Sequence, residues 1–282
     1  MTTRTTSLDR ALAANTWFVY AFFYLPILVL VVFSFNASTR VGIWRGFSTR
    51  WYGEVLRNPE VLDALKNSLI VAALSTVAAT VIGTAAALAI DRYRFRGRRG
   101  LDGILYLPII IPDVTMAVMM LLFFARAFAL IDAAGPRFQL GIGSITLSHI
   151  AFNISFVAVV VRARLGQLDG SLEEAARDLY ANSWQTFRRV TLPLILPGVL
   201  GGALLALTLS LDDVVVTAFV SGPGSTTLPV YVFGLVRRGV SPAINAISTI
   251  MLVASIGLVA LSLVFQRGPK ASRNTEMIKE TT

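Results

Sequence analysis

The chain has 282 residues, of which 55% are hydrophobic and only 15% charged, and its formal net charge is +9. Ordinary soluble domains carry about 25% charged residues, so this balance argues against a soluble enzyme, a disordered chain or a secreted scaffold. The lack of cysteine excludes disulfides and thiolate metal sites, and a single histidine, His149, excludes multi-histidine metal sites.

Six hydrophobic stretches are long enough to cross a membrane, since a spanning helix needs about 20 mostly apolar residues. In chain order they are residues 15–35, 68–90, 104–128, 144–161, 190–211 and 244–265. The sequence therefore predicts an all-α membrane protein with six transmembrane helices. We expect residues 1–282 to form a single transmembrane domain with its core at about 65–265.

The basic residues predict the orientation of these spans. The N-terminal tail, the connections after the second and fourth spans and the C-terminal tail carry most of the Arg and Lys residues. Because basic flanks mark the cytoplasmic side of a membrane, we expect both termini to be cytoplasmic. The long connections at residues 36–67 and 212–243 are then periplasmic loops. Since these flanks account for the basic surplus, no nucleic-acid partner is expected.

Three carboxylates, Asp113, Asp212 and Asp213, fall inside or at the edge of the predicted spans. A carboxylate at mid-bilayer costs about 2.5–3.5 kcal/mol, so such residues face a cavity or a partner. Counted from Ile104 in one continuous helix, Asp113 lies about 14 Å deep, near the midplane. The three predict an acidic path from the outside toward the centre. Alternatively, Asp113 caps a helix that restarts at Val114, and one of the two adjacent aspartates orients the following loop.

The connection at residues 164–190 contains the most informative local pattern, which predicts a short helix, a turn and a second helix. Ser171 and Glu174 match a capping box, Asn182 and Ser183 break the helix, and Ser183 can cap a second helix that runs through Phe187. The apolar face of the first helix consists of Leu172, Ala175, Ala176 and Leu179. The structural alternative is a surface helix that packs on the protein's own spans.

This connection resembles the EAA loop of ATP-binding-cassette importer permeases. The resemblance rests on Glu174-Ala175-Ala176 followed at the expected distance by Val190-x-Leu192-Pro193. Tyr180 stands where the family usually has glycine, and Asn182 could supply a left-handed residue nearby. Further segments resemble the inner-membrane permeases of bacterial spermidine/putrescine importers, most closely the putrescine type. They are residues 48–54, 107–113, 209–213, 219–224 and 239–242.

The resemblance implies a type I importer permease that forms half of the translocation pathway of an ATP-driven polyamine importer in the bacterial inner membrane. The implied partners are a dimer of ATP-binding subunits, a second homologous permease, a periplasmic polyamine-binding protein, the polyamine and membrane lipid. The chain itself would hold no cofactor and would not be an enzyme, because ATP is bound by the partner. The implied ATPase-coupling residues are Ser171, Glu173, Glu174, Ala175, Ala176, Asp178, Leu179 and Tyr180, and the implied substrate-pathway residues are Asp113, Asp212 and Asp213.

Two other classes of function are weighed against this interpretation. A stand-alone secondary transporter or channel for cationic amines predicts an internal duplication with broken helices in both halves, and the sequence contains no convincing repeat. A membrane-embedded enzyme needs a catalytic constellation, and the sequence has no metal-ligand spacing, phosphate loop or nucleophile motif.

Overall fold

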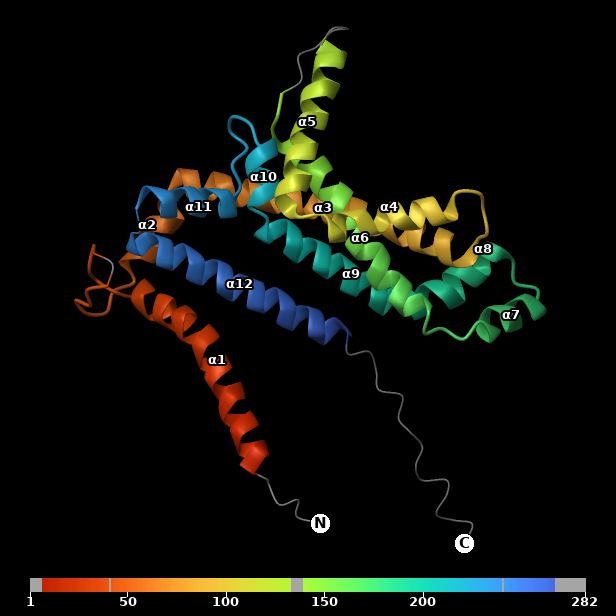
Figure 1. Ribbon diagram of the computed structural model, residues 1–282, viewed down its shortest axis with the longest axis horizontal. Coiled ribbons are helices and arrows are strands. Elements are labelled where there is room, and N and C mark those ends of the chain that lie inside the picture. The colour runs from red at the N-terminus through yellow and green to blue at the C-terminus, as the bar shows by residue number, and fades with distance from the viewer. Residues whose placement is uncertain (1–6, 41, 133–138, 240, 267–282) are drawn as a thin grey trace.

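The computed structural model describes residues 7–40, 42–132, 139–239 and 241–266 (Figure 1). These residues are helical or irregular, and the one strand-like feature among them is an isolated antiparallel bridge between Asn36 and Phe47. The helices are α1 (Ser7–Ser34), α2 (Arg50–Arg57), α3 (Pro59–Arg92), α4 (Arg98–Ile110), α5 (Asp113–Asp132), α6 (Ile142–Leu165), α7 (Ser171–Asp178), α8 (Ser183–Thr186), the π-helical turn η1 (Phe187–Thr191), α9 (Leu192–Asp212), α10 (Val215–Val220), α11 (Leu228–Arg238) and α12 (Pro242–Gln266).

Six helical segments in the described residues are long and apolar enough to cross a membrane, which confirms the predicted fold class. They are Leu8–Ser34, Pro59–Arg92, Asp113–Ile131, Ile142–Leu165, Ser183–Asp212 and Pro242–Ala260. The connections predicted at residues 36–67 and 212–243 contain helices of their own. The first holds α2 and the beginning of α3, and the second holds α10 and α11.

The third predicted span, residues 104–128, is wrong as a single helix. The chain leaves the helical conformation at Ile111, which is extended (φ −73°, ψ 132°), and α5 begins at Asp113. The cause is Pro112, which lacks an amide hydrogen and disfavours the helical conformation of the residue before it. Figure 1 shows α5 rising at a steep angle from the end of α4. The depth expected for Asp113 assumed an unbroken helix and is therefore not supported.

Helices α3, α6 and α9 pack against one another and form the centre of the molecule (Figure 1). Small residues let these helices approach closely, as is usual in membranes. A Cβ atom on Gly83 of α3 would lie 2.8 Å from the Ile154 carbonyl oxygen and 2.9 Å from the Val157 Cβ atom of α6. Gly202 of α9 faces Val157 from the other side, where a Cβ atom would lie 3.3 Å from the Val157 Cα atom.

A buried chain of hydrogen bonds crosses the same three helices. The Asn153 side-chain amide of α6 donates to Ser210 Oγ of α9 at 2.9 Å, and Ser210 Oγ bonds Ser75 Oγ of α3 at 2.9 Å. All three side chains are buried. Because hydrocarbon offers no alternative partner, these bonds fix the rotation of each helix toward the other two.

Helix α1 lies at the periphery and leans away from this centre (Figure 1). The most apolar stretch of α1 has no buried residue, and the main contacts of the helix are with α12. Near its end, Ser34 Oγ bonds the Tyr52 hydroxyl at 2.6 Å, and Trp51 Nε1 of α2 donates to the Asn36 carbonyl at 2.7 Å. These bonds attach the end of α1 and the residues after it to α2 rather than to the α3–α6–α9 core.

The close approach at Gly83 gives a prediction about stability. Gly83→Ala places a methyl group against the α6 backbone, and we expect it to lower the free energy of unfolding by about 1–3 kcal/mol. Gly257→Ala in α12 is the control, because no atom lies within 4 Å of the position that its Cβ atom would take. Thermal unfolding of the two purified variants measures the difference, and equal midpoints would show that the three helices are not locked at this point.

Candidate functional site

The connection between α6 and α9 folds into a helical hairpin at one end of the molecule, beyond the end of α6 (Figure 1). Helix α7 ends at Asp178, the chain turns, and α8 continues through η1 into α9. The predicted sequence of helix, turn and second helix is confirmed. The π-helical turn directly precedes Leu192 and Pro193, and such wide turns recur at functional sites.

Helix α7 has no buried residue. Its residues Leu172 and Ala175 are exposed, and so is Leu179, which follows the helix. Leu179 is 82% exposed and Tyr180, which follows it, is 97% exposed. The structural alternative of a helix that packs its apolar face on the protein's own spans is therefore not what the structure shows. An apolar edge that a protein leaves exposed on a projecting helix is available to a partner.

Glu173 anchors this projecting helix to two other elements. Its Oε1 atom accepts a hydrogen bond from Arg92 Nη2 at 2.8 Å and another from Thr191 Oγ1 at 2.7 Å. Arg92 is the last residue of α3, and Thr191 ends η1 directly before α9. The Glu173 side chain is 14% exposed, so this charged contact is partly shielded from water. Sequence reasoning missed it, because no local pattern links residues 81 positions apart.

The other acidic residues of α7 are not held in this way. Glu174 and Asp178 are exposed, and their side chains make no hydrogen bond or ion pair with any residue that the structure describes. Ala176 is half-buried on the inner side of the helix, beside exposed Ala175. The predicted set of residues thus divides into one anchored glutamate and an exposed surface around Glu174.

The predicted capping box of Ser171 and Glu174 is wrong. Gly170 is the N-cap residue, and Ser171 is already helical. The Ser171 amide donates to Asp169 Oδ1 at 2.9 Å, which replaces the expected side-chain cap. The same hydrogen bond lowers the pKa of the Asp169 carboxyl, because it stabilises the ionised form.

Tyr180 takes the turn conformation that the resemblance assigns to glycine. Its φ is +61°, and it is the only non-glycine residue with positive φ among the described residues. The Tyr180 amide donates to the Arg177 carbonyl at 2.9 Å and the Ala181 amide to the Ala176 carbonyl at 3.0 Å, which are the two bonds of a Schellman motif. Asn182 is not left-handed (φ −73°). Its side chain accepts from the Gln185 amide and, rather than Ser183, caps α8.

A second candidate site lies near the other end of α9, where Asp113, Asp212 and Asp213 line one cavity of about 250 Å³. The structure therefore brings the three carboxylates together, although they come from two distant segments. Asp113 begins α5 and Asp212 ends α9. The remaining lining is largely apolar and includes Pro108, Met116, Phe152, Phe156 and Leu209.

The two adjacent aspartates have different environments. Asp213 accepts hydrogen bonds from the amides of Val216 and Thr217 at 3.2 and 2.7 Å and from the Thr217 hydroxyl at 2.7 Å. It is the residue that orients the loop into α10, as expected for one member of the pair. Asp113 and Asp212 are exposed, and their side chains make no hydrogen bond or ion pair among the described residues.

His149 of α6 contacts both Asp213 and Thr217. The imidazole is fully buried, its Nε2 atom lies 3.0 Å from Thr217 Oγ1 and 3.3 Å from Asp213 Oδ2, and its Nδ1 atom has no partner among the described residues. The Thr217 hydroxyl donates to Asp213, so its oxygen accepts from His149 and the proton resides on Nε2. The histidine thus serves the geometry of the loop and does not line the cavity.

Comparisons with known proteins point to transport. Residues 79–268 match the family described as "Binding-protein-dependent transport system inner membrane component". The chain is 46% identical over 248 residues to the putrescine transport system permease protein PotI of Escherichia coli (strain K12), covering 87% of each chain. It is 42% identical over 262 residues to the spermidine/putrescine transport system permease protein PotC of the same strain, covering 93% of this chain and 95% of the relative.

A solved structure has the same fold. It is a bacterial ABC transporter involved in the import of the acidic polysaccharide alginate, and a chain of it superimposes with a TM-score of 0.76. The match covers 92% of this chain and 95% of that chain, at 20% sequence identity. At this identity the likeness concerns the fold alone.

The contrast between the adjacent aspartates gives a second prediction. Asp213→Ala leaves two backbone amides and the Thr217 hydroxyl without their acceptor, and we expect a loss of about 2–3 kcal/mol in the free energy of unfolding. Asp212→Ala removes a neighbouring carboxylate that has none of these bonds and should be nearly neutral. Thermal unfolding of both variants makes the comparison, and an equal effect of the two substitutions would contradict the assigned roles.

Proposed function

The chain belongs to the family of inner membrane components of binding-protein-dependent transport systems, and from this membership we propose that it forms half of the translocation pathway of an ATP-driven importer of polyamines such as putrescine and spermidine. It is the permease subunit of such an importer, and ATP hydrolysis belongs to a separate subunit. The choice of a polyamine as the substrate rests on sequence identity: over most of its length the chain is 46% and 42% identical to two polyamine permeases.

The chemistry of the carboxylate-lined cavity supports a polyamine. Such a substrate is a flexible chain with two or more positive charges separated by apolar spacers. Asp113 and Asp212 offer unengaged negative charges, and the faces of Phe152 and Phe156 suit the spacer and attract cations. Two separated carboxylates bind a cation without one deep trap, which a transport pathway requires. We assign Asp113 and Asp212 to direct substrate contact and Asp213 to positioning.

Coupling to the ATPase is the proposed role of α7. The exposed edge of Leu172, Ala175 and Leu179 suits an apolar groove on the partner, and the adjacent Glu174 suits a basic residue there. Ser171, Asp178 and Tyr180 extend this exposed surface. A displacement of α7 would reach the spans through Glu173, which is bonded to the end of α3 and to η1 before α9. The spans would then alternate between outward and inward access.

The proposed orientation places the α7 hairpin and both termini in the cytoplasm of a bacterium. The hydrogen bond between Arg92 and Glu173 supports it, because this bond requires the α3–α4 and α6–α9 connections to lie on the same side. Both connections are rich in arginine, in agreement with the positive-inside rule. The proposed partners are a dimer of ATP-binding subunits, a second homologous permease and a periplasmic polyamine-binding protein.

The division of α7 into an anchor and a docking surface is testable in the purified importer. Glu174→Arg should lower the amount of ATPase that copurifies, because it opposes a basic partner residue. Arg92→Glu should leave the ATPase bound but lower ATPase stimulation by the polyamine-loaded binding protein about tenfold, since the link to α3 is lost.

The charge-swapped pair Arg92→Glu/Glu173→Arg is the matched control for the second variant, because it restores opposite charges at the same positions. We expect it to recover part of the stimulation, because the opposite charges are restored but the Thr191 hydroxyl no longer has a carboxylate acceptor at position 173. If Arg92→Glu alone were stimulated normally, the contact would not transmit the motion. Unchanged assembly of Glu174→Arg would remove Glu174 from the docking surface.

The role of the cavity carboxylates is tested by uptake of radiolabelled putrescine. Asp113→Asn removes a negative charge that faces the cavity, and we expect uptake to fall about tenfold with assembly intact, the equivalent of one charged contact worth about 1.4 kcal/mol. Asp113→Glu keeps the charge and should retain most of the transport. Wild-type uptake by Asp113→Asn would exclude this residue from the pathway.

A further inference from the structure

The turn between α3 and α4 concentrates positive charge that the protein itself does not neutralise. Arg94, Arg96, Arg98 and Arg99 lie within six residues, and none of their side chains forms an ion pair or hydrogen bond with any residue that the structure describes. The neighbouring arginine, Arg92, is already bonded to Glu173. Four unneutralised guanidinium groups at such short spacing repel one another, so an external anion would stabilise this turn.

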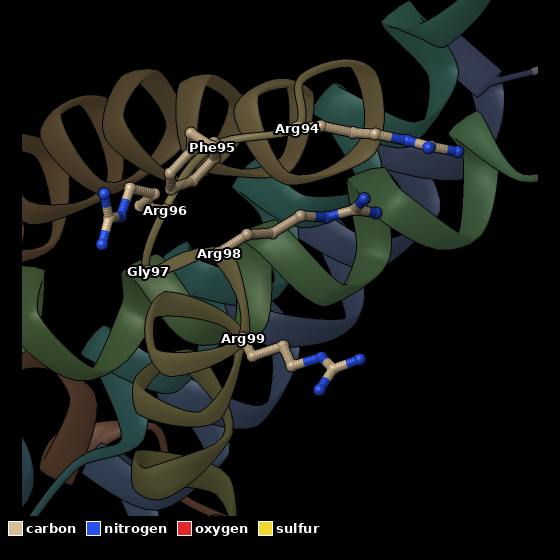
Figure 2. A pocket seen from close by; sticks show the side chains of 6 residues that line it. All are labelled: Arg94, Phe95, Arg96, Gly97, Arg98 and Arg99. Carbon is tan, nitrogen blue, oxygen red and sulfur yellow. The ribbon is translucent and has the colours of Figure 1, made fainter.

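The turn borders an open hollow of about 520 Å³, lined by residues 94–99 (Figure 2). Gly97 makes the reversal possible, because its φ of +93° is accessible to glycine. Figure 2 shows the side chains of Arg94, Arg98 and Arg99 extending in one direction and that of Arg96 in the opposite direction. Three of the four cations therefore lie on one side of the turn.

An exposed apolar stripe continues from this cluster along α4. Arg99, Gly103, Tyr106 and Ile110 recur at spacings of four, three and four residues, which places them on one face of the helix. Tyr106 and Ile110 are exposed, as is Leu107 beside them. From Arg99 to Ile110 the stripe is about 16 Å long at 1.5 Å per residue, close to half of a hydrocarbon core of about 30 Å.

We propose that this turn and stripe form a binding site for an anionic phospholipid, with the phosphate on Arg94, Arg98 and Arg99 and an acyl chain along the exposed face of α4. A soluble anion would need only the cations. The adjoining stripe of acyl-chain length favours a ligand that is both anionic and long-chained. Aromatic Tyr93 and Phe95, both exposed beside the arginines, are residue types that lie at the headgroup level of membranes. The lipid site is independent of the transported substrate.

Lipid retention by the purified importer complex tests the site. The complex is reconstituted in nanodiscs of equal parts phosphatidylglycerol and phosphatidylcholine, extracted in mild detergent, and its retained lipids are measured by native mass spectrometry. We expect phosphatidylglycerol to be enriched over phosphatidylcholine. Each of Arg94→Gln, Arg98→Gln and Arg99→Gln should lower the enrichment about fivefold, the value of one basic residue near an anionic surface.

Arg96→Gln is the matched control, because it removes the same charge from the same turn but from the side facing away. It should change the enrichment by less than about twofold, and Arg99→Lys should retain most of it. An equal loss in Arg96→Gln and Arg99→Gln would mean diffuse attraction without a site and would overturn the proposal.

Two further measurements distinguish a phospholipid from other ligands of the turn. Inorganic phosphate and sodium chloride are compared at equal ionic strength, and phosphatidylglycerol should be lost to the same extent in both. A greater loss in phosphate would assign the turn to a free anion and overturn the lipid site. Unchanged lipid retention in Arg99→Gln, together with loss of the ATPase or of the second permease, would identify a protein contact and also overturn it.

Discussion

The close packing of α3, α6 and α9 is the constraint on which both candidate sites depend. Each site is assembled from segments that this packing holds together: the α7 hairpin is suspended between α6 and α9, and the carboxylate cavity lies beside the other end of α9. In a membrane the hydrophobic effect does not drive helices together, so contact between backbones and interhelical hydrogen bonds must do so. Gly83 and Gly202 provide the contact on either side of Val157, and the Ser75–Ser210–Asn153 bonds set the rotation.

Breaks in the helices, rather than the helices themselves, create the cavity. Pro112 ends α4 and starts α5 in a new direction, which brings Asp113 to the cavity edge. Asp213 stops α9 and directs the chain into α10, with buried His149 holding Thr217 in place. Irregular backbone at such a position is tolerated only where other groups satisfy its hydrogen bonds or where it lines a water-accessible space. Both conditions are met here, because Asp213 supplies acceptors and the cavity supplies access.

Much of this arrangement could be predicted from the sequence, and the failures have physical causes. Hydropathy located the long helices because their apolar lengths are set by the bilayer. The break before Asp113 was readable from Pro112 but was outweighed by the continuous hydrophobicity of the stretch. The cap of α7 was misassigned because Asp169, outside the expected motif, captures the Ser171 amide. The contact of Arg92 with Glu173 could not be predicted, since it depends on how two distant helix ends meet in space.

Tyr180 shows that the geometry of the α7 turn is set by its hydrogen bonds rather than by residue type. A left-handed residue other than glycine costs about 1–2 kcal/mol, and the two Schellman bonds together with the Asn182–Gln185 cap offset this cost on either side of the turn. These bonds hold the turn between α7 and α8 in one conformation, and Glu173 ties the hairpin to α3 and η1. Directly after Thr191, α9 runs for 21 residues to Asp212, a length of about 30 Å, and contains Pro197. The anchor of the hairpin and the wall of the cavity therefore lie at the two ends of one helix, which is the spatial relation on which any coupling between the two sites depends.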